Sequence, residues 1–221
     1  MKILLIFASP AEASAMGSFS PFGALSGLSF PVDNHRVELL LCGVGMVQAA
    51  ITTAMQLARH RPDLVVHAGI SGSYLTHHAI GETVMIESEC FPELGKQSGD
   101  RFTTLDQMGF GFLNLPFNNN TLLNPLARGR FKIGHPYVSG ATVNEITTRR
   151  ERAEAIHRQF GAATESMEGG AVLAACLAAR VDCLQLRVIS NYCLPPPDDH
   201  WQLKTAIEQL GTAVVDVLKT L

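Results

Sequence analysis

Short apolar runs alternate along the chain with longer segments in which apolar residues recur at helical spacing. The runs predict buried strands at residues 3–8, 37–42, 64–68, 83–86, 136–139 and 183–190. The longer segments predict helices at residues 47–60, 149–160, 168–179 and 203–218. Strands that alternate with helices are typical of an α/β protein whose mostly parallel sheet is covered on both faces. Because no repeat or linker interrupts the pattern, we expect residues 1–221 to form one domain.

Two segments depart from this pattern. Residues 91–134 are rich in Gly, Pro, Asn and Phe and predict long loops, which in a compact domain serve a site or an interface. The start of the chain, Lys2 followed by the apolar residues 3–8, resembles a short signal peptide. Its apolar part is too short for one, and Pro10 follows almost at once, so a buried first strand suits it better.

Composition narrows the function classes. The 221 residues are 47% hydrophobic and 17% charged, which excludes a disordered chain. The net charge of −3 argues against a broad basic surface, and no apolar run approaches the roughly 20 residues of a membrane helix. We therefore expect neither nucleic acid nor a membrane as a partner. The five cysteines are scattered and form no C-x-x-C pair, which predicts reduced structural thiols in a cytoplasmic protein without a metal or cofactor. Cys42 and Cys176 lie in apolar segments and are expected to be buried.

Candidate site residues follow the predicted strands, because ligands of α/β sheets bind beyond the carboxyl ends of the strands. One such turn is Gly43-Val44-Gly45, which has the start of a dinucleotide-binding fingerprint. Gln48 stands where the third glycine of that fingerprint belongs. A tight turn with close backbone packing is the alternative, and a nicotinamide-dependent oxidoreductase is the function that we favour least.

Two polar residues near the later elements are each open to two interpretations. Glu168 begins an otherwise apolar helix, where a carboxylate either suits the helix N-terminus or lies buried near the sheet and needs a partner. The two hydroxyls of a ribose would be such a partner. Asn191 follows the strand at residues 183–190 and either caps a turn or pairs its amide with the edge of a purine.

Four segments together resemble the purine nucleoside phosphorylase/nucleosidase superfamily, and its 5′-methylthioadenosine/S-adenosylhomocysteine nucleosidase branch best. They are residues 43–50, 68–72, 166–171 and 187–191, of which the last two carry Ser-Met-Glu-Gly-Gly-Ala and Arg-Val-Ile-Ser-Asn. The resemblance extends from residue 1 to the C-terminal helix, with residues 91–134 poorly matched. It implies a three-layer α/β/α sandwich with a mostly parallel central mixed sheet, a small-molecule purine nucleoside as substrate, and a homodimer.

The resemblance also implies roles for single residues. Glu12 falls on the family's water-activating glutamate. Glu168 falls on the carboxylate that holds the ribose hydroxyls, with Met167 packed beneath the sugar. The remaining substrate-binding positions, which flank the purine or cover the rest of the nucleoside, are Ser71, Gly72, Val143, Asn144 and Trp201.

Asn191 departs from the family, which has an aspartate there as the general acid for purine N7. An asparagine cannot deliver its own proton, but it can accept from a protonated N7 and donate to a 6-oxo group. It therefore points to a hypoxanthine-type base. The strings at residues 142–144 and 190–192 are also similar to the futalosine hydrolases, which remove hypoxanthine from futalosine on a route to menaquinone.

The type of reaction is a separate question. The loop after the first strand offers no Arg or Lys to hold phosphate, so we expect hydrolysis. A 5′-methylthioadenosine/S-adenosylhomocysteine nucleosidase, a phosphate-dependent phosphorylase and a non-catalytic nucleotide sensor stay open as alternatives. Phe110, Phe112 and Phe117 either cover the 5′ group or fill a dimer contact. We expect solvent exposure for the pair at residues 77–78 and the charged residues 149–152.

Overall fold

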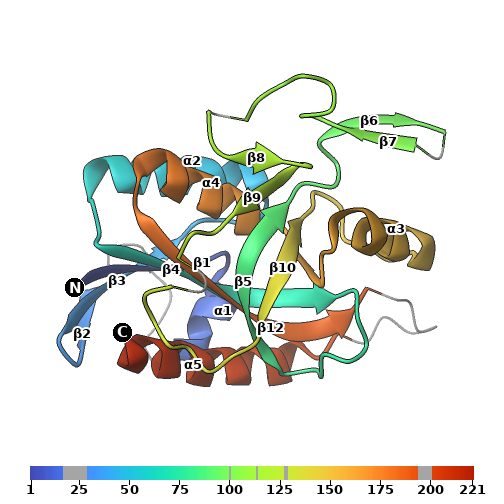
Figure 1. The fold of residues 1–221 in the computed structure, drawn as a ribbon. Coiled ribbons are helices and arrows are strands. Elements are labelled where there is room, and N and C mark those ends of the chain that lie inside the picture. Colours follow the sequence, from blue (N-terminus) through green and yellow to red (C-terminus); the bar gives the residue numbers. More distant parts are fainter. Residues whose placement is uncertain (17–28, 100, 113, 127–128, 194–200) are drawn as a thin grey trace.

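A mixed ten-stranded sheet runs through the described part of this computed structural model, which comprises residues 1–16, 29–99, 101–112, 114–126, 129–193 and 201–221 (Figure 1). The strand order is β2-β3-β1-β4-β11-β10-β5-β9-β8, and β12 pairs with both β4 and β5. The strands of this sheet are β1 (Lys2–Phe7), β2 (Ser29–Val32), β3 (His35–Leu41), β4 (Leu64–Ser73), β5 (Thr83–Cys90), β8 (Phe117–Asn118), β9 (Thr121–Leu123), β10 (Tyr137–Thr142), β11 (Thr164–Ser166) and β12 (Asp182–Tyr192). A separate hairpin is formed by β6 (Gly95–Ser98) and β7 (Arg101–Thr104).

The longest ladders of the sheet are parallel, and its antiparallel ladders are short. β12 runs parallel to β4 along the full length of that strand, and β1 runs parallel to both β3 and β4. The antiparallel ladders cover only two to four residues each. Because β4, β11, β10, β5 and β12 pair in succession and β12 returns to β4, these five strands form a closed ring. The expected mostly parallel mixed sheet is confirmed.

Helices cover both faces of the sheet, which confirms the three layers. α2 and α4 lie on one face, and α1 and α5 on the other (Figure 1). The all-apolar strand β1 follows from this arrangement, since Leu4 and Ile6 face the α2–α4 side while Leu5 and Phe7 face α5. The helices are α1 (Pro10–Ala13), α2 (Met46–Arg59), α3 (Arg150–Phe160), α4 (Gly169–Ala179) and α5 (Leu203–Thr220), with a short 3-10 helix, η1, at Ser14–Met16.

Two helices have sequence patterns that their neighbours explain. α4 packs against α2, β10 and β12, so it is apolar on every side. α3 buries only Ala153 and Ile156, which pack against Tyr74 and Ala141 at the end of the sheet, and most of its remaining residues are charged or polar. Among the described residues, no helix combines the length and the apolar composition needed to cross a membrane.

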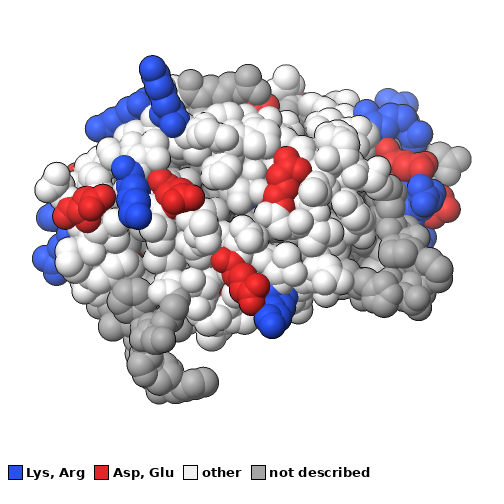
Figure 2. Space-filling view, turned by 90° about the horizontal axis from the view of Figure 1, so that it is seen from below, with Lys and Arg blue, Asp and Glu red and all other residues white. Residues whose placement is uncertain are grey.

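The outer surface on the α5 side of the molecule carries charges of both signs. Figure 2 shows this face, on which Lys and Arg side chains alternate with Asp and Glu side chains and are separated by uncharged surface. The described residues therefore present no broad patch of a single charge on this side of the molecule.

The structure extends or corrects several expected elements. The strand expected at residues 64–68 continues through the glycine-rich segment to Ser73. Its glycines admit neighbouring side chains instead of ending the strand, because a Cβ at Gly69 would lie 2.7 Å from Glu12 Oε1. Residues 91–134, expected to be loops, also contain β6 to β9. These strands, and the unexpected β2 and β11, span only two to four residues each, too few for a clear apolar period.

β12 contains one extra residue near its end. The register steps from Ile189 opposite Ser71 to Asn191 opposite Gly72, so Ser190 has no partner position on β4. This is a β-bulge, a feature that re-aims side chains and is frequent beside active sites.

Candidate active site

A cavity of about 320 Å³ lies beyond the carboxyl ends of β1, β4 and β12. Its volume is at the lower end of the range for small-molecule sites. Most of the site residues predicted from the sequence line it, together with Ser9, Ile146, Glu165 and Ser190. The predicted residues that the structure brings together here are Glu12, Ser71, Gly72, Val143, Met167, Glu168, Asn191 and Trp201.

The Glu12 carboxylate is fixed from two elements. Oε2 accepts hydrogen bonds from the backbone N–H groups of Ala8 (3.0 Å) and Ser9 (3.1 Å), as in a capping box at the start of α1. Oε1 accepts from the N–H of Ile70 on β4 (3.0 Å). A glutamate that only caps a helix needs no contact with a distant strand. The hydrogen bond from Ile70 therefore gives Glu12 a role beyond starting α1. It fixes a carboxylate, 8% exposed, in the wall of the cavity.

Glu168 lines the same cavity and is held by the glycine turn. Its Oε1 accepts a hydrogen bond from the N–H of Gly45 at 2.8 Å. Gly43 and Gly45 have φ of 84° and 92°, which a residue with a side chain rarely adopts. The Gly43–Gly45 segment is therefore a tight turn that presents an N–H to Glu168, and the dinucleotide interpretation has no support in the described residues. Burial raises the pKa of Glu168, while the Gly45 N–H and the charge of Arg187 act in the opposite direction.

A buried arginine lies behind these acids. Arg187 is 2% exposed and donates to the carbonyl oxygens of Leu186 (3.0 Å) and His67 (3.3 Å) and to Nδ1 of His67 (3.0 Å). Burial, and then the charge of Arg187, lowers the pKa of His67 well below its usual value, so the imidazole stays neutral and accepts. Neither residue was assigned a role from the sequence. A titratable residue inside each of two buried, mostly apolar strands is the signal that would have found them.

A further carboxylate supports the cavity wall from behind. Glu89 on β5 is 1% exposed and accepts from Thr142 Oγ1 at 2.9 Å, and that oxygen accepts from the N–H of Gly170 at 2.6 Å. A Cβ at Gly169 would lie 1.9 Å from Glu89 Oε1, so the first turn of α4 packs directly on this carboxyl group. Burial raises the pKa of Glu89 to about 7, opposed by Arg187 and Thr142. Glu89 therefore ties β5, β10 and α4 together beside Glu168.

Asn191 follows the bulge and is oriented by its neighbours. Ser190 Oγ lies 2.8 Å from Asn191 Oδ1 and 3.1 Å from the carbonyl oxygen of Ser71, so the hydroxyl joins β12 to β4 next to the amide. A Cβ at Gly72 would lie 3.2 Å from Asn191 Nδ2. The glycine thus leaves room for the amide, which lines the cavity beside Ser71. The Ser71 hydroxyl has no hydrogen-bond partner among the described residues.

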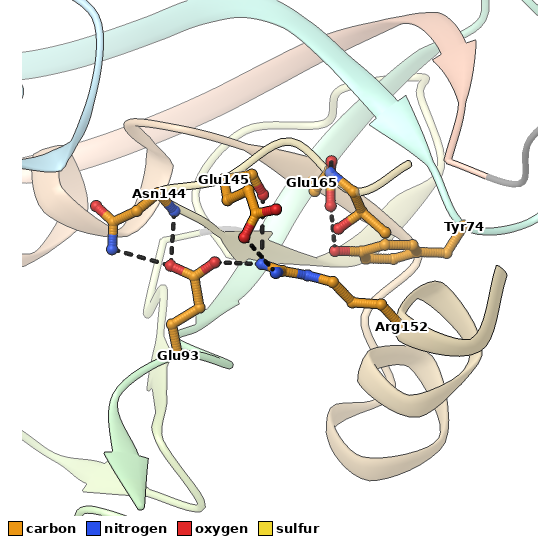
Figure 3. Close-up of polar contacts among 7 residues, drawn as sticks. Tyr74, Glu93, Asn144, Glu145, Arg152 and Glu165 are labelled. Carbon is orange, nitrogen blue, oxygen red and sulfur yellow. Dashed lines mark hydrogen bonds and ion pairs between the residues drawn. The ribbon is translucent and has the colours of Figure 1, made fainter. Parts of the chain in front are cut away.

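Asn144 does not line this cavity, which corrects the expectation that it flanks the purine. Its side chain is exposed, and its backbone N–H and side-chain amide both donate to Glu93 Oε2, at 2.8 and 2.9 Å (Figure 3). Its neighbours Val143 and Ile146 line the cavity. Val143 was predicted as a site residue and lines the cavity, Asn144 was predicted and does not, and Ile146 was not predicted.

Two segments were expected to be exposed to solvent, and each expectation is only partly correct. His77 is exposed, whereas His78 is 6% exposed, with its Nδ1 3.2 Å from Glu82 Oε1. Arg150 is exposed, whereas Arg152 is half-buried between acidic side chains. All five cysteines are free and buried, including Cys42 and Cys176, for which burial was expected. Within the described ranges, no three His, Cys, Asp or Glu side chains are placed to hold a metal ion.

A larger apolar groove, of about 760 Å³, runs between α2 and α4. Phe112 and Phe91 line it, with ring centroids 5.2 Å apart, and Phe112 stacks on Phe117 at 4.8 Å. Phe112 is therefore part of the groove and not of the cavity that holds Glu12. Next to the groove, α2 exposes three large apolar side chains: Val47 (71%), Ile51 (55%) and Met55 (49%).

The fold and the cavity define an α/β protein with a small-molecule site beyond its strand ends, lined by three glutamates, an amide and a tryptophan. The chain belongs to the phosphorylase superfamily, whose sequence model matches residues 2–221. It is 34% identical to a futalosine hydrolase of Thermus thermophilus over 180 residues, which cover 78% of this chain and 76% of the relative.

Two further comparisons agree with this family. The chain is 30% identical to a futalosine hydrolase of Streptomyces coelicolor, with 97% of this chain and 94% of the relative covered. Its fold is similar to that of a Colwellia psychrerythraea 5′-methylthioadenosine/S-adenosylhomocysteine nucleosidase solved in complex with adenine. That match has a TM-score of 0.77 at 20% identity and covers 100% of this chain and 96% of the other.

Proposed function

We propose that this protein is a nucleosidase that hydrolyses the N-glycosidic bond of futalosine and releases hypoxanthine, a step of menaquinone biosynthesis. The observation that carries the proposal is the Asn191 amide, fixed by Ser190 in the same cavity as Glu12 and Glu168. Relatives named futalosine hydrolase, at 34% and 30% identity over most of the chain, support the same substrate.

In the proposed reaction the bond between C1′ of the ribose and the purine nitrogen breaks, and its electron pair leaves with the base. A water molecule forms the new bond to C1′ and gives its proton to Glu12, whose carboxylate is held still by three backbone N–H groups. Glu168 binds the ribose hydroxyls and favours the positive charge that develops on the sugar. Ser71, with its unpaired hydroxyl, is placed to bind the water or the sugar.

Asn191 recognises the departing base. Nδ2 donates to the 6-oxo group, while Oδ1, which already faces Ser190 Oγ, uses its second lone pair to accept from N7–H. The purine takes its proton from solvent, because an amide has none to give. An adenine nucleoside would place its 6-amino group against the Nδ2 donor, and this mismatch leaves buried polar groups unpaired.

Hydrolysis is favoured over phosphorolysis by the charges around the cavity. Its lining includes Glu12, Glu165 and Glu168, and no Lys or Arg among the described residues. A phosphate dianion needs cationic side chains or several free N–H groups, and here it would meet carboxylates. A water molecule carries no charge, so the carboxylates do not repel it, and Glu12 can act as its base.

We further propose that a second copy of the chain covers the apolar groove between α2 and α4, giving a homodimer. A groove of about 760 Å³ flanked by exposed Val47, Ile51 and Met55 is a large apolar surface for a chain of this size. The free, buried cysteines suit a reducing compartment, and we place the enzyme in the cytoplasm.

The test is release of free base, followed by chromatography, from futalosine, inosine and 5′-methylthioadenosine in phosphate-free buffer. Hypoxanthine from futalosine is the expected product. Release of adenine from 5′-methylthioadenosine would support a hydrolase but overturn hypoxanthine as the recognised base. Release that requires added phosphate would make the protein a phosphorylase, and tight binding without any product would make it a sensor.

A further inference from the structure

The loop between β10 and α3, residues 143–149, forms one wall of the nucleoside cavity. Val143, 1% exposed, and Ile146 both line the cavity from this loop. The loop has no regular secondary structure, so neighbouring strands do not satisfy most of its backbone N–H groups. Side chains from other elements therefore have to hold it in place.

The first half of the loop is held by an acid and an arginine. Glu93 Oε2 accepts both the backbone N–H and the side-chain amide of Asn144, and Glu93 Oε1 pairs with Arg152 of α3 (Figure 3). Arg152 also donates to the side chain of Glu145 at 3.0 Å and to its carbonyl oxygen at 3.3 Å. The Arg152 side chain is 21% exposed and that of Glu93 is 26% exposed, so this pairing is only partly screened by solvent.

The second half is held by a buried glutamate. Glu165 Oε1 accepts the N–H of Thr147 at 2.9 Å, and Glu165 Oε2 accepts the hydroxyl of Tyr74 at 2.5 Å (Figure 3). Glu165 lies on β11 directly opposite Gly72, the glycine that makes room for Asn191. The same carboxylate therefore joins the loop to the strand that carries the proposed base-binding end of the cavity.

We propose that Glu93, Arg152 and Glu165 are positioning residues, which fix the 143–149 loop so that Val143 and Ile146 pack against the bound base. The proposal rests on the proposed function only in naming the ligand as a purine nucleoside. None of the three is assigned to the chemistry: Glu93 and Arg152 lie outside the cavity lining, and both Glu165 oxygens are engaged by the protein. Asn144 then works as the point where the loop is attached, not as a ligand of the base.

The first test compares two arginines on one helix. Arg152→Ala is expected to raise KM for the nucleoside roughly tenfold, with a smaller change in kcat, because a loosened wall weakens binding before it affects the bond that breaks. Arg150→Ala is the matched control, since Arg150 lies on the same helix and pairs with Glu154 in an exposed contact. Arg152→Lys should recover part of the loss. KM within twofold of wild type in Arg152→Ala would overturn the proposal.

The second test does not depend on the substrate. Glu93→Ala should speed hydrogen exchange in a peptide spanning the 143–149 loop, while Glu93→Gln, which keeps an acceptor for Asn144, should retain most of the protection. Unchanged exchange in Glu93→Ala would overturn the proposal even if wild type releases hypoxanthine. Conversely, a wild type that acts on another nucleoside would refute the proposed substrate, and the exchange result would still stand.

Discussion

The carboxylate of Glu168 accepts a hydrogen bond from the backbone N–H of Gly45 at 2.8 Å, across 123 residues of sequence. The contact joins two motifs that look unrelated in the chain, a glycine turn after β3 and the start of an apolar helix. A buried carboxylate needs a donor, and a turn with φ of 92° at Gly45 supplies one without a side chain. The glycine turn therefore belongs to the ribose end of the proposed site.

Gly45→Ala tests this relationship. A Cβ at Gly45 would meet nothing within 4 Å, so the cost comes from the backbone angle alone, about 1–3 kcal/mol. We expect the turn to shift, Glu168 to lose its donor and KM for the nucleoside to rise. Gly109→Ala is the control, because Gly109 also has open space and a positive φ, of 83°. Equal KM values in the two variants would show that the Gly45 turn does not support nucleoside binding.

Glu12→Gln should remove turnover and preserve binding. Glutamine keeps one oxygen for the N–H donors at Glu12 but cannot take a proton from water, so kcat should fall by roughly 10²–10⁴-fold. Isothermal titration with the nucleoside should give a dissociation constant near that of wild type. If binding is lost together with turnover, and the melting temperature falls, Glu12 serves only to cap α1.

Asn191→Asp should move the base preference from hypoxanthine towards adenine nucleosides. The aspartate removes the Nδ2 donor, while Ser190 still orients the side chain through the remaining oxygen. We expect the ratio of kcat/KM for the 6-oxo and 6-amino substrates to change by about 10²-fold or more. A ratio that stays the same while both rates fall would mean that Asn191 does not contact the base.

Glu89 should make stability depend on pH. Its pKa is raised by burial from an ordinary 4.5 to about 7, so the folded state holds the proton more tightly than the unfolded state. The stability that this proton provides is fully present below the unfolded pKa and is lost as the pH rises through about 7. Glu89→Gln cannot titrate, so its free energy of unfolding relative to wild type should improve by up to about 3 kcal/mol between acid and mildly alkaline pH.

Urea denaturation across that pH range measures the effect. Glu87→Gln is the control, since Glu87 lies on the same strand but is only half-buried. Parallel stability curves for wild type and Glu89→Gln would show that the pKa of Glu89 is the same in the folded and the unfolded protein.

Val47→Glu should dissociate the proposed dimer. It places a charge on α2 at the most exposed of the apolar side chains beside the groove. Thr212→Glu, an exposed position on α5 across the sheet, is the control. Sedimentation should give twice the chain mass for wild type and the control and a single mass for Val47→Glu. A wild type that sediments as a monomer would overturn the proposed homodimer.

The core of the fold was predictable because its elements are long and carry a clear pattern. β1 and most of β12 are apolar because helices cover both faces of the sheet, and α4 is apolar where it packs on the sheet and on α2. The positions of all three were found within a few residues. β11 was missed for the opposite reason. It has three residues, and only its pairing with β4 and β10 makes it a strand. Its last residue, Ser166, also accepts a hydrogen bond from the N–H of Gly169 at the start of α4.

The site was predictable where a residue contacts the cavity directly and not where it acts through another residue. Glu12 and Asn191 come after predicted strands and Glu168 begins an apolar helix, and the sequence reveals both kinds of place. Glu93 and Arg152 are 59 residues apart, and nothing in either local sequence shows that they meet. Asn144 shows the same limit, since which way a loop residue faces is set by its partner across the fold.

The bulge at Ser190 makes the site depend on the number of residues in β12 as well as on their types. β12 has one residue more than β4 between Ile189 and Asn191, and side chains of a strand alternate between its faces. Deleting Ser190 would restore a regular ladder with Asn191 still opposite Gly72, but it would remove the hydroxyl that lies 2.8 Å from the amide oxygen. The other residues of the site would then still be present in the sequence, and the amide would lack the group that orients it.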